Sequence, residues 1–232
     1  MTTRRTFLLS TAAMLAAPAY AQDPQCATFT KDRQAAVTPS AALQKLKDGN
    51  ARFVAGRSIH CDLIAQVRAT ASGQAPFAAV VGCIDSRVPP ELVFDQQIGD
   101  IFVARVAGNF VNTDIIGSLE FATQLAGAKA IIVLGHSDCG AVKGAIDDVK
   151  LGNLTATLAN IRPSVAKVAK LNGPHTSKDP LFVQAVADQN VKDAAAHLLS
   201  RSTVLQDLVS AGRLNVAAAM HDINTGVVSW LS

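Results

Sequence analysis

The stretches VVGCIDSR at residues 80–87 and LGHSDCG at residues 134–140 decide the fold expected of this chain. Each closes a short apolar run, residues 77–81 in the first case and residues 130–134 in the second. Continuous apolar runs that end in glycine and polar residues are typical of strands buried in a parallel sheet. Parallel strands share one carboxyl edge, where open α/β sheets bind ligands, so we expect Cys83, His136 and Cys139 to converge there.

These three side chains have the composition of a metal site. Two thiolates and one imidazole are a three-ligand set found in catalytic zinc centres, which leaves a fourth position for water. The alternative is two cysteines buried for packing alone and a histidine in a loop. That alternative gives no purpose to Asp85 and Arg87, two charged residues at the end of the same strand. The sequence therefore predicts one Zn²⁺ per chain.

The remaining pattern predicts a single α/β fold. Further strands are expected at residues 101–106, 214–221 and 227–231, and the short turn at residues 224–226 makes the last strand antiparallel to its neighbour. We therefore expect a central, mostly parallel sheet of four strands with a fifth, antiparallel C-terminal strand, flanked by helices. After a polar lead at residues 22–37, the helices are expected at residues 38–54, 62–71, 89–94, 113–125, 140–150, 154–169, 181–199 and 204–211.

Residues 1–21 have the features of a cleavable export signal. They contain the twin arginines Arg4 and Arg5, an apolar run at residues 7–17 and the A-x-A sequence at residues 19–21. A membrane anchor is the alternative, but the apolar run is short for a bilayer span. The general secretory route is also open. We predict a periplasmic or secreted protein whose residues 22–232 form one catalytic domain.

The composition and net charge of the chain exclude some classes of binding partner. The chain has 232 residues with 49% hydrophobic and 17% charged residues, which indicates a globular protein with a sizeable core. Without residues 1–21, 19 basic residues stand against 18 acidic ones. This near balance argues against nucleic acid, and against an anionic membrane surface after signal cleavage.

The motifs resemble those of a known family. The pattern C-x-D-S-R, here Cys83 to Arg87, followed by H-x-x-C-G, here His136 to Gly140, is similar to that of the β-class carbonic anhydrases. The resemblance extends from about Leu46 to Trp230, nearly the whole chain after residue 21. It implies the zinc-dependent, reversible hydration of CO₂ to bicarbonate and a proton.

Two charged residues beside the predicted metal are expected to assist it. Two thiolate ligands make zinc a weaker Lewis acid than three histidines do, so we expect other residues to assist the zinc-bound hydroxide. Asp85 is expected to accept a hydrogen bond from zinc-bound hydroxide and to orient it, while Arg87 holds that carboxylate off the metal. The alternative is an ordinary surface ion pair.

The resemblance also implies substrate contacts and a homodimer or a dimer of dimers. Gln74 matches a glutamine that donates to a substrate oxygen, and Phe102 matches a phenylalanine that lines the pocket. Phe121 falls where some members have tyrosine. Ala107 and Gly108 lie at a strand end near the site. Because the glutamine and the aromatic residues of one site come from different subunits in the family, the active unit is expected to contain at least two chains.

Two cysteines and four histidines remain. Cys26 and Cys61 either stay free or form a disulfide, since spare cysteines tend to pair in an oxidising compartment. A bridge would close a loop of about 35 residues and contribute about 3–4 kcal/mol in the chain-entropy model. His60, His175, His197 and His221 receive no role, although a proton relay to buffer is the function to consider for them.

Two other functions stay open from the sequence. The same fold and metal would suit hydrolysis of a CO₂ analogue such as carbonyl sulfide or carbon disulfide. A non-catalytic, zinc-stabilised scaffold would need four closed protein ligands and would leave Arg87 and Gln74 without a role.

Overall fold

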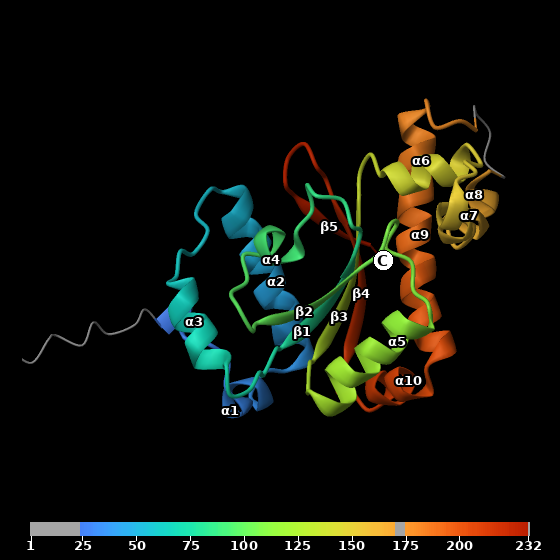
Figure 1. Ribbon diagram of the computed structural model, residues 1–232. Helices are drawn as coiled ribbons and strands as arrows, with labels where there is room; N and C mark the ends of the chain where they lie inside the picture. The colour runs from blue at the N-terminus through green and yellow to red at the C-terminus, as the bar shows by residue number, and fades with distance from the viewer. Residues whose placement is uncertain (1–23, 170–174, 232) are drawn as a thin grey trace, which may run out of the picture.

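The computed structural model describes residues 24–169 and 175–231 (Figure 1). The predicted signal at residues 1–21 lies outside the described residues. A twisted sheet runs through the centre, with helices packed on both of its faces (Figure 1). Every helix within residues 24–169 and 175–231 is too short or too polar to span a bilayer.

The five strands follow the predicted topology. Their order in the sheet is β2-β1-β3-β4-β5, in which the first four are parallel and β5 is antiparallel to β4. The strand order places β1 and β3 next to each other, which brings their carboxyl ends together. The strands are β1 Ala78–Gly82, β2 Ile101–Arg105, β3 Ala130–His136, β4 Asn215–His221 and β5 Val228–Leu231.

Both faces of the sheet are buried, which explains the continuous apolar runs of its central strands. Along β1 and β3, residues 79, 81, 131 and 133 point into the larger hydrophobic core. Their neighbours at positions 78, 80, 132 and 134 point into a second, smaller core on the other face. Successive side chains of a strand alternate between faces, so a strand covered on both sides needs apolar residues at every position.

The two faces are covered by different parts of the chain (Figure 1). The smaller core lies under α2 Pro39–Val54 and α4 Pro90–Val93. The larger core lies under the second half of the chain, where α9 Pro180–Arg201 packs on β3 and β4. Gly135 permits this close approach, because a Cβ there would lie 2.3 Å from Val191 Cγ2 on α9. The other helices on this side include α5 Thr113–Glu120, α6 Gly140–Ile146 and α10 Thr203–Ser210.

Some helix predictions were wrong in their bounds. The helix expected at residues 154–169 is two helices, α7 Gly152–Ala159 and α8 Arg162–Val168, because Pro163 fits only the first turn of a new helix. The helix expected at residues 113–125 has the predicted bounds, but Asn112 caps it and after α5 it continues as a π-helical turn, Phe121–Leu125. Helix α6 ends at Ile146, four residues before its predicted end.

The region expected to be a polar lead is ordered structure from residue 24. It forms a 3₁₀ turn, Pro24–Cys26, and the helix α1 Lys31–Ala35. The amide of Gln34 is buried and donates to the carbonyls of Pro76, at 2.6 Å, and Ala126, at 2.8 Å. These bonds join α1 to the loops that precede β1 and β3.

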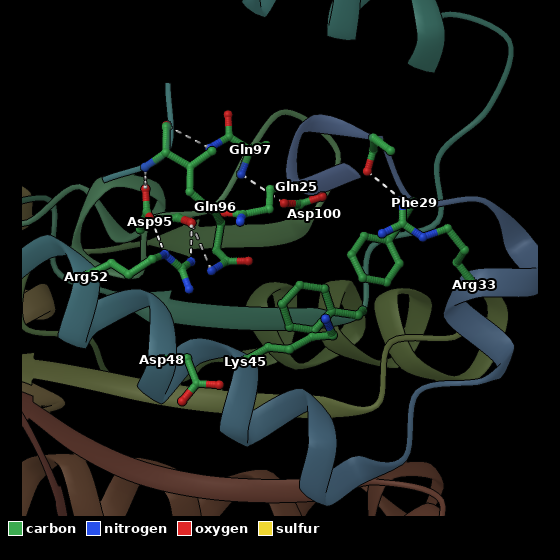
Figure 2. A pocket seen from close by; sticks show the side chains of 13 residues that line it. Gln25, Phe29, Arg33, Lys45, Asp48, Arg52, Asp95, Gln96, Gln97 and Asp100 are labelled. Atoms are coloured by element: carbon green, nitrogen blue, oxygen red, sulfur yellow. Dashed lines mark hydrogen bonds and ion pairs between the residues drawn. The ribbon is translucent and has the colours of Figure 1, made fainter. Parts of the chain in front are cut away.

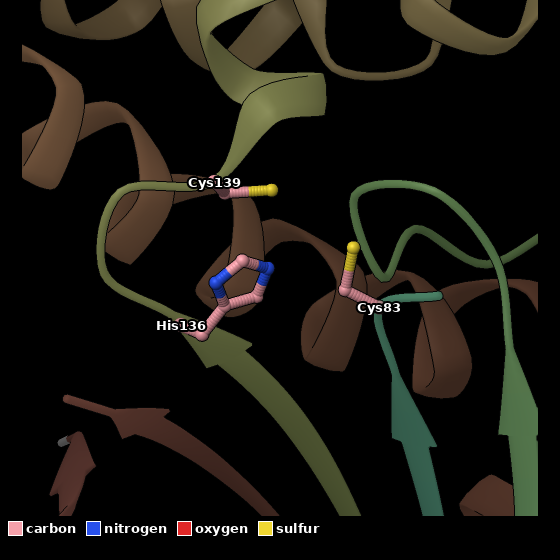
Figure 3. Close-up of side chains that lie close together, drawn as sticks. All are labelled: Cys83, His136 and Cys139. Carbon is pink, nitrogen blue, oxygen red and sulfur yellow. The ribbon is translucent and has the colours of Figure 1, made fainter. Parts of the chain in front are cut away.

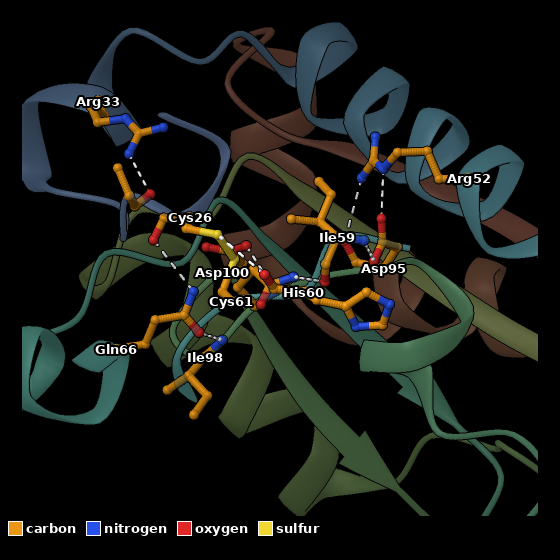
Figure 4. Close-up of a disulfide and its surroundings, with 12 residues drawn as sticks. Cys26, Arg33, Arg52, Ile59, His60, Cys61, Gln66, Asp95, Ile98 and Asp100 are labelled. Atoms are coloured by element: carbon orange, nitrogen blue, oxygen red, sulfur yellow. Dashed lines mark hydrogen bonds and ion pairs between the residues drawn. A yellow bond between two sulfur atoms is a disulfide. The ribbon is translucent and has the colours of Figure 1, made fainter. Parts of the chain in front are cut away.

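A disulfide between Cys26 and Cys61 fastens the same region (Figure 4). Of the two alternatives for these cysteines, the structure has the bridge. It joins the 3₁₀ turn to the loop before α3 Leu63–Thr70, across 35 residues of sequence. Cys83 and Cys139 remain free and buried.

Candidate metal centre

Three potential ligands meet at the carboxyl edge of the sheet (Figure 3). Cys83 follows β1, His136 is the last residue of β3, and Cys139 is the N-cap residue of α6. Their ligand atoms all lie within 4.8 Å of one another, and all three residues are buried. The predicted convergence is therefore present, and these residues form a group able to hold a metal ion.

The histidine presents the nitrogen that a metal requires. His136 Nδ1 lies 2.9 Å from the carbonyl oxygen of Ser137. A carbonyl oxygen only accepts hydrogen bonds, so Nδ1 carries the proton in the neutral ring and Nε2 keeps its lone pair. Nε2 is buried and has no hydrogen-bond partner among the described residues. This arrangement is the usual one for a metal-binding histidine.

The two cysteine thiols influence each other's ionisation. A hydrogen bond from Cys139 holds the pKa of Cys83 well below its usual value, aided by contacts with His136 and with the Gly108 N–H. The same bond to Cys83, together with burial, raises the pKa of Cys139. The ionisation of each thiol therefore depends on the other. Zn²⁺ is a borderline-soft cation that binds cysteine as the thiolate, and the two sulfurs and the imidazole fit its ligand preferences.

Asp85 is held next to this group by Arg87. Arg87 donates from Nε to Asp85 Oδ1 at 2.9 Å and from Nη2 to Oδ2 at 2.7 Å. The hydrogen bonds from Arg87 hold the pKa of the Asp85 carboxyl well below its usual range. Asp85 Oδ2 lies 3.8 Å from His136 Nε2. The predicted contact between Asp85 and Arg87 is therefore present, and the ionised Asp85 carboxylate lies beside the ligand group.

Arg105 is a residue of the site whose role the sequence did not reveal. It lies at the end of β2, in register with Gly82, and donates from Nε to the Cys83 carbonyl at 2.8 Å. Its Nη2 donates to the Asp85 carbonyl at 2.6 Å. Arg105 thus clamps the backbone that carries both side chains. The available signal was a single basic residue at the end of an otherwise apolar strand.

Two of the predicted substrate residues lie in a turn beside the ligand group. Ala107 and Gly108 follow β2, and the Gly108 N–H donates to Cys83 Sγ at 3.3 Å. The Gly108 N–H therefore contacts a proposed metal ligand. Contact of Ala107 or Gly108 with substrate stays a prediction.

The other three predicted substrate residues lie apart from the three ligands within one chain. Phe102 and Phe121 make an edge-to-face contact, with ring centroids 6.3 Å apart, and line a cavity of about 560 Å³ beside α5. Gln74 is exposed and precedes the amino end of β1, whereas Cys83 follows its carboxyl end. The length of β1 therefore separates Gln74 from the ligands of its own chain.

Comparisons with known proteins give matches to carbonic anhydrases. The sequence pattern of the carbonic anhydrase family matches residues 78–228. The chain is 37% identical to "Carbonic anhydrase 2" of Mycobacterium tuberculosis over 192 residues, which cover 81% of this chain and 90% of that protein. It is 35% identical to a carbonic anhydrase of Mycolicibacterium smegmatis over 200 residues, which cover 84% of this chain and 94% of that protein.

Solved structures show the same fold. A β-carbonic anhydrase of Aspergillus fumigatus superimposes with a TM-score of 0.64 at 26% identity, covering 83% of this chain and 90% of that one. The Coccomyxa β-carbonic anhydrase in complex with acetazolamide also gives a TM-score of 0.64, at 28% identity, covering 71% of this chain and 75% of that one. The family match, the curated relatives and the shared fold lead to one conclusion: this chain belongs to the β-class carbonic anhydrases.

Proposed function

We propose that this chain binds one Zn²⁺ through Cys83, His136 and Cys139 and catalyses the reversible hydration of CO₂. The observation that carries the proposal is the buried ligand group with an ionised carboxylate, Asp85, 3.8 Å from His136 Nε2. A Zn²⁺ held there would supply Lewis acidity that makes water nucleophilic near neutral pH.

The residues of the chain then have separate tasks. Asp85 accepts a hydrogen bond from the attacking water species and so orients its lone pair. Arg87 holds both oxygens of that carboxylate, and the resulting low pKa keeps Asp85 an acceptor at neutral pH. Arg105 fixes the backbone beneath Cys83 and Asp85. Removing one positioned hydrogen-bonding group of an active site typically lowers turnover by about 10²–10³-fold.

We propose further that the active unit is a homodimer or a dimer of dimers. Gln74 is exposed and distant from the ligands of its own chain, which is what a residue that serves a partner's site requires. The edge strand β2 and the half-exposed Phe121 beside it offer a surface for a second copy. Two β-carbonic anhydrases of Sordaria macrospora, one of which superimposes with a TM-score of 0.62 at 26% identity, are tetrameric. That structural match covers 72% of this chain and 90% of that one.

Export to the periplasm or the outside is also part of the proposal. The signal features of residues 1–21 suggest it, and the Cys26–Cys61 bridge supports it, because disulfides persist mainly in oxidising compartments. Fractionation of the native host, with detection of a chain that begins at residue 22, tests this point. A full-length chain in the cytoplasm would contradict it.

The proposed activity is tested on the purified chain from residue 22 onward. We expect one zinc per chain by elemental analysis and rapid CO₂ hydration by stopped-flow measurement. Sulfide release from carbonyl sulfide and carbon disulfide is measured on the same zinc-loaded sample. Sulfide release without CO₂ hydration would favour the alternative hydrolase, and zinc without either activity would favour the scaffold.

A further inference from the structure

The turn after β2 aims a backbone N–H at one of the proposed zinc ligands. The Asn109 N–H donates to the Val106 carbonyl at 2.9 Å, and Gly108 has a φ of +82° at the third position of this turn. A positive φ there is the type II geometry, in which the central peptide is flipped relative to type I. With this orientation the Gly108 N–H reaches Cys83 Sγ at 3.3 Å.

The turn is packed tightly from its other side. A Cβ on Gly108 would lie 2.4 Å from Cδ1 of Ile161, the residue before α8. Both this contact and the positive φ require glycine at this position. The turn therefore lies between the end of β1 and the helices of the larger core, so those helices are able to control its orientation.

Asn190 makes the contact through which such control would act. It lies in the middle of α9, and only 2% of its surface is exposed. Its Nδ2 donates to the Gly108 carbonyl at 2.8 Å. Asparagine is a poor helix former, and a buried amide is costly unless it is hydrogen-bonded. The buried residues around it on α9 are apolar: Val183, Val186, Ala187, Val191 and Ala194.

From these contacts we propose that Asn190 is a positioning residue of the metal centre. By holding the Gly108 carbonyl, it sets the orientation of the turn and keeps the Gly108 N–H directed at Cys83 Sγ. This inference rests on the proposed zinc site. Asn190 does not touch Cys83, so it acts on the metal through the backbone of Gly108.

The expected consequence is a change in how Cys83 binds metal. A hydrogen bond to a ligand sulfur orients it and reduces the electron density that it donates. Loss of such outer contacts typically costs about 10–100-fold in metal affinity or activity. Without the Asn190 amide, no other donor among residues 24–169 and 175–231 holds the Gly108 carbonyl, and the N–H on the other side of the glycine is free to turn away from Cys83.

The test compares variants of Asn190 with a matched control on the same pair of helices. Asn190→Leu and Asn190→Ala both remove the donor, and Ala is the smaller side chain if Leu prevents folding. The control is Ser164→Ala. Ser164, on α8, is 1% exposed and donates to Asp193 Oδ2 on α9 at 2.7 Å. This hydrogen bond between helices is partly buried and has no described contact to the turn.

Three quantities are measured on each protein. They are the dissociation constant of Zn²⁺ by chelator competition, the thiolate-to-cobalt charge-transfer absorption of the Co²⁺-substituted protein, and the melting temperature of the metal-free chain. For both Asn190 variants we expect zinc binding about 10-fold weaker or more and a shifted charge-transfer band. Ser164→Ala should lower the melting temperature and leave both metal readouts at the parent values.

Two results would overturn the inference in distinguishable ways. If the Asn190 variants lose stability as Ser164→Ala does but keep the parent's zinc affinity and absorption band, Asn190 only packs α9 and the inference is wrong. If the parent chain itself binds no Zn²⁺, the proposed function fails first.

Discussion

The four cysteines form two pairs near opposite ends of the sheet, and the two pairs have different chemistry. Cys26 and Cys61 are bonded to each other, in a region that contacts the loops before β1 and β2. Cys83 and Cys139 follow β1 and β3 at the carboxyl edge and remain free, although their sulfurs lie within 4.8 Å of each other. Proximity of two cysteines therefore does not decide between a structural bridge and a ligand pair. What differs is the third group, because His136 directs a free nitrogen at the second pair.

The polar groups near the two cysteine pairs also differ in whether the protein satisfies their hydrogen bonds. Next to the disulfide lies a cavity of about 470 Å³ lined largely by charged and polar side chains (Figure 2). There Arg52 Nε contacts Asp95 Oδ2 at 2.6 Å, and Asp95 Oδ1 accepts from the Ile59 N–H at 3.0 Å. Asp95 is thus satisfied by the protein. At the carboxyl edge, a buried nitrogen and two buried sulfurs remain available to a ligand, which marks that end as the reactive one.

The largest effect should come from removing a cysteine of the Cys83–Cys139 pair. Cys83→Ala removes one of three ligands, so we expect loss of stoichiometric zinc and of CO₂ hydration, while the Cys26–Cys61 bridge stays intact. Elemental analysis, stopped-flow rates and thiol counting under denaturing conditions measure the three outcomes. One zinc per chain retained in Cys83→Ala would show that the ligand assignment is wrong.

Removing the structural pair should have the complementary effect. The double variant Cys26→Ser, Cys61→Ser is expected to lose about 3–4 kcal/mol of unfolding free energy, because it releases a closed loop of 35 residues. Zinc content and the CO₂ hydration rate should stay at the parent values under conditions where the variant is folded. Denaturant unfolding of both proteins gives the difference. Loss of zinc from the folded double variant would contradict the separation of the two pairs.

The strands and the ligand group were predictable because their signals are local. A strand covered on both faces needs an unbroken apolar run, and residues 77–81 and 130–134 supply one each. Polar residues that follow such runs in parallel strands must meet at one edge. The position of Cys83 and His136 therefore followed from the sequence alone.

The features that sequence analysis missed depend on contacts between distant segments. Arg105 and Asn190 act through backbone carbonyls 20 or more residues away, and nothing in their neighbours along the chain indicates these partners. The disulfide was an open choice because its formation depends on how two loops fold together. The two-helix structure of residues 152–168 was signalled by Pro163, whose effect the periodicity of the apolar residues concealed.

The third prediction concerns Asp85, whose carboxylate lies beside the metal ligands. Asp85→Asn keeps an oxygen that accepts from the Arg87 N–H but removes the negative charge that orients the nucleophile. We expect turnover to fall by about 10²-fold, or roughly 2.7 kcal/mol in activation free energy, with zinc still bound. Arg87→Lys keeps the charge but not the two parallel bonds, so it should reduce turnover less. An Asp85→Asn enzyme as fast as the parent would contradict the role given to Asp85.

The smallest expected effect concerns Asp100, at the opposite end of the molecule. Only 8% of Asp100 is exposed, and its Oδ2 accepts from the Gln97 N–H at 2.9 Å. Burial raises the pKa of its carboxyl to about 6, against the opposing effects of that N–H and of the charges of Arg33 and Lys45. The unfolded chain releases this proton near pH 3.9. Between about pH 4 and pH 6 the folded protein therefore holds a proton that the unfolded chain has lost, and the resulting penalty to stability is complete above pH 6.

Asp100→Asn should accordingly stabilise the protein, and only at neutral pH. The amide keeps an acceptor for the Gln97 N–H and has no charge to bury, so we expect a gain of about 1–2 kcal/mol at pH 7.5 that shrinks as the pH falls from 6 towards 4. The matched control is Asp95→Asn, equally buried but paired with Arg52, which should destabilise the protein instead. Unfolding free energies of the parent and both variants at pH 7.5 and pH 4.5 measure the effect, and effects common to all three proteins cancel in the differences. A gain for Asp100→Asn that is the same at both pH values would mean that packing, and not the buried charge, limits stability at this end of the sheet.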